Sequence, residues 1–85
     1  MMKNKILSFT NKIFRDELNI NVLITENSRL SELGVDSIGF MILIVYLENE
    51  FGVEIDIEKI LENQYEEITI GHLINNVIWV KYNAQ

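Results

Sequence analysis

The residues with the clearest chemical potential lie in the stretch Gly34-Val35-Asp36-Ser37, just before a long apolar run. Asp36 is a residue type preferred at the N-cap of a helix, so Ser37 is expected at the first helical position. The first backbone N–H groups of a helix have no partner within it, and the helix dipole adds partial positive charge there. A phosphate ester on the Ser37 hydroxyl would therefore be stabilised. Taken alone, however, an Asp-Ser pair is also an ordinary capping sequence.

The sequence supplies no catalytic partner for this serine. An acyl-transfer enzyme needs a base beside its nucleophile, and the single histidine, His72, is distant in the chain. The absence of cysteine excludes disulfides and thiolate metal sites. Asp56, Glu58 and Glu62 have the pattern of a solvated helix face rather than of a cation site. We expect no catalytic residue and no metal site, and thiol chemistry would need an imported thiol.

Length and charge limit the classes of function. The 85 residues allow one small domain, which we place at residues 1–85, and 48% apolar residues can form a packed core. The net charge of −6, from 13 acidic and 7 basic residues, disfavours nucleic acid as a partner. It suits docking onto basic protein surfaces, or serves solubility alone.

No segment has the pattern of a membrane span or a signal peptide. The longest apolar run, Ile38 to Leu47, is about half of the roughly 20 residues that a bilayer-spanning helix needs. The apolar run after Lys5 ends within two residues, which is too short for a signal peptide. These features predict a cytoplasmic protein without a membrane span.

Hydrophobic periodicity and capping residues predict four helices. The first covers about Asn4 to Leu18, and the second runs from Asp36 as N-cap to about Phe51, with Gly52 as its C′ residue. A short third helix, Ile57 to Leu61, follows Asp56, and the last begins after Thr69. The absence of proline also favours helices.

A long loop, Asn19 to Gly34, joins the first two helices, and its scattered apolar residues are expected to pack across the domain. The predicted fold is all-α, a four-helix bundle with a short third helix and this long loop between the first and second helices.

The stretch Leu33-Gly34-Val35-Asp36-Ser37-Ile38, with Phe51-Gly52-Val53-Glu54-Ile55 one helix later, resembles the acyl carrier protein family. The resemblance extends to the helix layout, the length and the acidic charge. It implies that Ser37 holds a covalent 4'-phosphopantetheine arm, attached by a phosphopantetheinyl transferase that docks beside Asp36. Cargo would then be carried as thioesters on the arm, and the chain itself would catalyse nothing. We expect a monomer that also meets an acyltransferase, a ketosynthase or an adenylating enzyme.

The second helix departs from the fatty-acid carriers of this family, because Ile38 to Leu47 carry no charge. A helix that is apolar all round is either buried on more than one side or serves as a contact face. We predict that it docks partners through residues beside the arm, as in polyketide or nonribosomal peptide carriers. The predicted docking residues are Asp36, Ile38, Met41, Ile42, Val45 and Glu48.

Two alternatives stay open at this stage. One is a peptidyl or D-alanyl carrier protein, which an adenylating enzyme would load. The other is a small helical adaptor that binds one partner through the apolar second helix and holds no prosthetic group. The sequence does not distinguish the cargo or the pathway.

Overall fold

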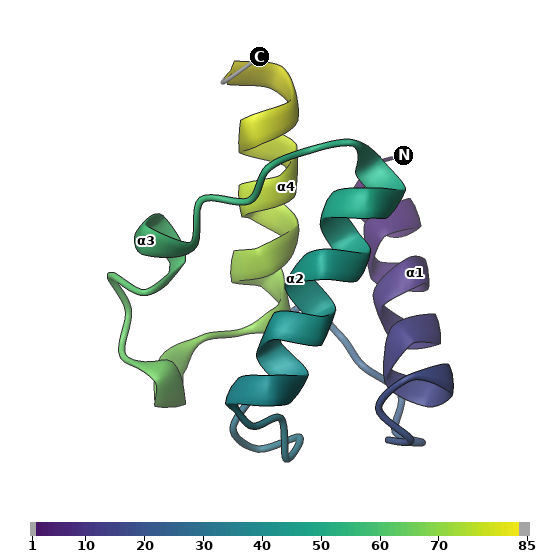
Figure 1. Cartoon of the computed structure of the whole chain (residues 1–85). Coiled ribbons are helices and arrows are strands. Elements are labelled where there is room, and N and C mark those ends of the chain that lie inside the picture. The colour runs from purple at the N-terminus through teal and green to yellow at the C-terminus, as the bar shows by residue number, and fades with distance from the viewer. Residues whose placement is uncertain (1, 84–85) are drawn as a thin grey trace.

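A computed structural model describes residues 2–83 and shows a helical bundle (Figure 1). Its elements are α1 (Met2–Asp16), α2 (Ser37–Phe51), α3 (Ile57–Ile60), the 3-10 turn η1 (Tyr65–Glu67) and α4 (Ile70–Asn83). Helices α1, α2 and α4 pack against one another, and α3 packs against α4. Within residues 2–83 there is no β-strand, so the predicted all-α bundle with a short third helix is confirmed.

The two ends of α2 are set by the predicted capping residues. The Asp36 carboxylate accepts a hydrogen bond from the Gly39 N–H at 2.8 Å, as an N-cap does. Gly52 has φ of 64°, and its N–H donates to the Glu48 carbonyl. Glycine adopts this left-handed conformation without a steric penalty, which explains why the helix stops there.

Helix α1 begins and ends two residues earlier than the sequence predicts. Asn19 has φ of 56°, and the Ile20 N–H turns back to donate to the Phe14 carbonyl at 2.8 Å. Asparagine tolerates the left-handed region better than most residues. The apolar periodicity continues to Leu18, but this backbone reversal ends the helix at Asp16.

The loop between α1 and α2 is held at both ends rather than free. The Asn11 side-chain amide donates to the Ile24 carbonyl at 3.2 Å and accepts from the Ile24 N–H at 3.0 Å. Farther along, the Leu30 N–H donates to the Ile68 carbonyl at 3.0 Å. Ile24 and Leu30 are buried, as expected of apolar anchors. Leu23, in contrast, is 83% exposed. The hydrogen bonds with Asn11 are made by the backbone of the adjacent residue, Ile24, whose side chain is the buried one.

The segment after α2 contains the predicted short helix α3 and one element that was not predicted, the η1 turn. Helix α3 follows Asp56, whose carboxylate accepts from the Lys59 N–H at 3.1 Å, and it ends one residue before the predicted Leu61. The η1 turn then leads into α4. It lies beside the N-terminal end of α2, as Figure 1 shows, and so comes close to the candidate site.

Candidate functional site

Ser37 is the first residue of α2 and its side chain is exposed to solvent. The bond from Gly39 to Asp36 uses one of the amide groups at this end of the helix. The preceding amides of Ser37 and Ile38 have no acceptor within a helix that begins here. The Ser37 hydroxyl is therefore accessible to another protein, and an anion attached to it would lie at the positive end of the helix.

Two glycines, Gly34 and Gly39, allow the backbone conformation and the close packing at the start of α2. Gly34 has φ of 80°, a conformation that side-chain-bearing residues rarely adopt. At Gly39 a Cβ atom would come within 3.1 Å of the Val35 side chain and 3.4 Å of the Asp36 carboxylate. A side chain at position 39 would therefore crowd the capping carboxylate next to Ser37.

Tyr65 in η1 contacts both the residues before α2 and its first turn. Its hydroxyl donates to the Val35 carbonyl, and its ring meets the edge of Phe40 with centroids 6.1 Å apart. Burial, and secondarily the negative charge of Asp36, raises the pKa of Tyr65 above its usual value. No sequence pattern pointed to Tyr65, because its partner is 30 residues earlier in the chain.

The outer side of α2 beside Ser37 is an exposed apolar surface. Ile38 is 70% exposed, and Met41 and Val45 are 48% and 47% exposed. A shallow groove of about 490 Å³ runs along this surface, which we call the α2 face; it is lined by Ser37, Ile38, Met41, Ile42, Val45 and Tyr46. The structure thus leaves part of the uncharged run from Ile38 to Leu47 unburied. Tyr46 follows Ile42 by one turn, so helical spacing could have placed it in the predicted set.

The remaining predicted docking residue, Glu48, has a structural contact. Its carboxylate accepts a hydrogen bond from the Ile55 N–H at 2.9 Å, which fixes the chain after α2. Asp36 is exposed next to Ser37 and caps the helix. Docking roles for both residues remain predictions.

His72 has a capping role at the start of α4. The imidazole of His72 caps α4: its Nδ1 accepts from the Thr69 N–H at 2.9 Å, while the Thr69 hydroxyl accepts from the His72 N–H at 3.2 Å. In a capping box an acidic residue usually stands three places after the N-cap, and here His72 occupies that position. Residues 2–83 contain no cluster of three His, Cys, Asp or Glu side chains able to hold a metal ion. In the same residues, no helix is long and apolar enough to cross a membrane.

Comparison with known proteins identifies the family. The family described as "Phosphopantetheine attachment site" matches residues 11–74, a region that includes the whole of α2. The chain belongs to this family, which is that of the acyl carrier proteins. The resemblance drawn from the motif around Ser37 is thereby confirmed.

A curated relative of this carrier family is acyl carrier protein AcpXL of Mesorhizobium japonicum (strain LMG 29417 / CECT 9101 / MAFF 303099). It is 32% identical over 50 residues, which cover 56% of this chain and 54% of the relative. The chain thus spans about half the length of the curated relative that it matches. No solved structure matches the chain.

Membership in the family means that the cofactor is covalently bound 4'-phosphopantetheine. The site geometry fits such a group. It offers an exposed hydroxyl at the start of a helix, amides without a helical acceptor, and an adjoining apolar groove. Helix amides favour the anion of a serine phosphodiester, and the exposed surface leaves open space for its linker.

Proposed function

We propose that this protein carries acyl or aminoacyl groups as thioesters on a 4'-phosphopantetheine arm attached to the Oγ atom of Ser37, and shuttles them between biosynthetic enzymes. The observation that carries the proposal is the exposed Ser37 hydroxyl at the first position of α2, inside the region that matches the family. The attached arm supplies the thiol that a chain without cysteine lacks. Residues 1–85 act as a single carrier domain, working as a monomer in the cytoplasm.

The chain's own residues have a passive but defined part in this function. The Asp36 cap and the Tyr65 contact keep the start of α2 in place, so that Ser37 is presented to the transferase in one orientation. The helix amides stabilise the phosphodiester anion without forming a catalytic site. We infer that the protein is not an enzyme, since its substrates react only in the active sites of its partners.

The α2 face is the proposed docking surface for these partners. Its exposed apolar side chains adjoin Ser37, so an enzyme that covers them also covers the arm. Exposed apolar area of this kind is typical of protein contact sites. The partners are a phosphopantetheinyl transferase and then an acyltransferase, a ketosynthase or an adenylating enzyme. The absence of charge along Ile38 to Leu47 favours polyketide or nonribosomal peptide assembly over fatty-acid synthesis.

The proposal is tested by the intact mass of the protein after co-expression with a phosphopantetheinyl transferase of broad specificity. We expect a gain of one phosphopantetheinyl unit in the wild type and none in Ser37→Ala. Ser31→Ala, which removes another exposed serine hydroxyl just upstream, serves as the control and should still be modified. A wild-type protein that stays unmodified would instead favour the adaptor, a small helical protein without a prosthetic group.

A further inference from the structure

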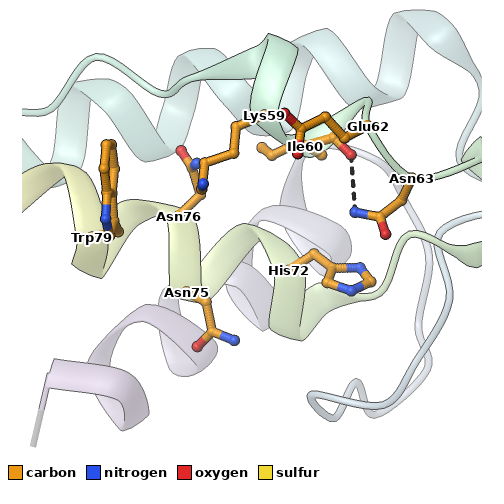
Figure 2. A pocket seen from close by; sticks show the side chains of 8 residues that line it. All are labelled: Lys59, Ile60, Glu62, Asn63, His72, Asn75, Asn76 and Trp79. Atoms are coloured by element: carbon orange, nitrogen blue, oxygen red, sulfur yellow. Dashed lines mark hydrogen bonds between the residues drawn. The ribbon is translucent and has the colours of Figure 1, made fainter.

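A second concave site lies between α4 and the segment formed by α3 and the residues after it (Figure 2). It has a volume of about 310 Å³, at the lower end of the range of small-molecule pockets. Its lining residues are Lys59, Ile60, Glu62, Asn63, His72, Asn75, Asn76 and Trp79. Helix α2 contributes none of them, so this α3–α4 pocket is separate from the attachment site.

Asn76 presents a hydrogen-bond donor to the pocket. The residue is only 5% exposed, and its Oδ1 accepts from the Asp56 N–H at 3.0 Å. Because a backbone N–H can only donate, the amide oxygen must face Asp56 and the NH₂ group must point away. No hydrogen bond within residues 2–83 uses that NH₂ group, yet no buried side-chain nitrogen there lacks a partner. The nitrogen must therefore reach solvent through the pocket that Asn76 lines.

His72 offers a second donor, again with its orientation fixed by the fold. Its Nδ1 accepts a hydrogen bond from the Thr69 N–H, so this nitrogen carries no proton in the neutral ring. The proton of the neutral imidazole is then on Nε2, the other ring nitrogen. That N–H belongs to a half-buried side chain in the pocket wall and has no acceptor among the hydrogen bonds of residues 2–83.

Lys59 adds a positive charge and Trp79 an apolar surface. The Lys59 ammonium lies 5.2 Å from the centre of the Trp79 ring, and Figure 2 shows it extending toward Asn76. Lys59 forms no ion pair in the described part of the chain, where the ion pairs are Lys3–Glu26 and Arg15–Asp16. Its charge is therefore available to a bound anion.

We propose that the α3–α4 pocket binds a small monocarboxylate with a short aliphatic chain. A carboxylate only accepts hydrogen bonds, which matches the donors of Lys59, His72 and Asn76, and the Trp79 ring can cover the aliphatic part. Glu62 is the one acidic residue in the wall, and its charge disfavours more highly charged anions such as phosphate. This site is independent of the arm at Ser37 and adds a binding activity to the carrier role.

Trp79 makes the proposal measurable, because it is the only tryptophan of the chain. The full-length protein is titrated with sodium butyrate, and its tryptophan fluorescence is compared with sodium chloride and sodium phosphate at matched ionic strength. We expect a saturable change with butyrate, weaker binding of phosphate, and only a linear drift with chloride. The same titration of Ser37→Ala should give the wild-type affinity, so failure of the carrier function would leave this result unchanged.

Two variants and a control separate the pocket from general charge effects. Lys59→Gln removes the charge at an exposed position and should weaken butyrate binding roughly tenfold. Asn76→Asp keeps an oxygen for the Asp56 N–H but replaces the donor with an acceptor, and it should lose binding. Lys5→Gln removes an exposed lysine of α1 outside the pocket and should bind like the wild type. The proposal is overturned by a butyrate response no different from that of chloride, or by a Lys59→Gln affinity equal to that of the wild type.

Discussion

Two side chains and one glycine fix the start of α2 around Ser37. The Asp36 carboxylate accepts the Gly39 N–H, the absence of a side chain at Gly39 leaves room for it, and the Tyr65 hydroxyl reaches the Val35 carbonyl from η1. The features at Asp36 and Gly39 are local, because these residues are three positions apart in the chain. The third joins segments 30 residues apart, so it links the conformation of the site to that of the whole bundle.

Tyr65→Phe tests this link, because it keeps the ring against Phe40 and removes only the hydroxyl. The lost hydrogen bond should lower the free energy of unfolding by about 1 kcal/mol at pH 7. The folded state raises the pKa of Tyr65 above 10.0, chiefly through burial and then through Asp36. The contribution of the hydroxyl is therefore complete below that pH and is lost as the pH rises through the raised pKa.

Urea unfolding at pH 7 and pH 11 measures this difference. Wild type and Tyr65→Phe should differ clearly at pH 7 and less at pH 11. Tyr82→Phe, at a position that is 70% exposed, should match the wild type at pH 7 and serves as the control. A gap between wild type and Tyr65→Phe that stays constant over this pH range would contradict the assignment.

Sequence reasoning reached Ser37 and its cap because the signal is local. A glycine turn, a capping aspartate and an apolar run identify the start of a helix from adjacent residues. Tyr65 and the pocket donors were not predicted, since each depends on a backbone group that only the fold brings near. For Asn76, the decisive partner is the N–H of Asp56, which is 20 residues earlier.

Among the elements, the long loop and α4 depend on one close backbone approach. The Gly71 N–H donates to the Glu26 carbonyl at 2.8 Å, and the Ile70 N–H donates to the Ser28 carbonyl at 2.9 Å. A Cβ atom at position 71 would be 3.0 Å from the Glu26 carbonyl oxygen. The glycine at the start of α4 is thus required by the loop that crosses it.

Gly71→Ala should destabilise the protein although alanine favours helices. The intrinsic preference for alanine over glycine in a helix is about 1 kcal/mol, and overpacking against a backbone oxygen that already accepts a hydrogen bond costs about 1–3 kcal/mol. We expect a net loss of about 1 kcal/mol in urea unfolding followed by circular dichroism. Asn75→Ala, at an exposed position of the same helix, should change stability by less than about 0.5 kcal/mol. A Gly71→Ala protein more stable than the wild type would show that the loop moves away at no cost.

The ends of the helices were predicted best where a capping residue in the sequence marks them. The ends of α2 match the prediction because both capping residues act within the helix. The end of α1 was two residues off, because a reversal at Asn19 overrides an apolar pattern that continues to Leu18. The η1 turn was missed, because it has only three residues and no side chain caps its start, so neither an apolar period nor a capping residue marks it.

At the scale of the whole molecule, charge and apolar surface are distributed unevenly. The chain has a net charge of −6, yet the α2 face around the attachment site has an uncharged, apolar lining. A partner that fits this face gains apolar contact there, while the acidic remainder of the surface attracts basic partners from a distance. The α2 face thus orients a bound partner, while the acidic remainder of the surface speeds the approach of basic partners.

Val45→Glu tests the role of this face in partner binding. The side chain is 47% exposed, so the substitution should change the free energy of unfolding by less than about 0.5 kcal/mol. We expect kcat/KM for modification of Ser37 by the transferase to fall roughly tenfold, because a charge replaces an apolar contact.

The matched control is Leu23→Glu, which places the same charge at an exposed apolar position outside the groove. Modification kinetics of this variant should remain close to those of the wild type. Equal rates for Val45→Glu and the wild type would remove the α2 face from the docking surface of this partner.

The packing of α1 against α4 also bears on how the protein is made. The chain between the end of α1 at Asp16 and the start of α4 at Ile70 must be synthesised before these two helices can meet. At about 5–20 residues per second, a ribosome takes several seconds over that stretch. Throughout this interval the apolar side of α1, with Ile6, Ile13 and Phe14, has no C-terminal helix to cover it, and the nascent chain is open to chaperones.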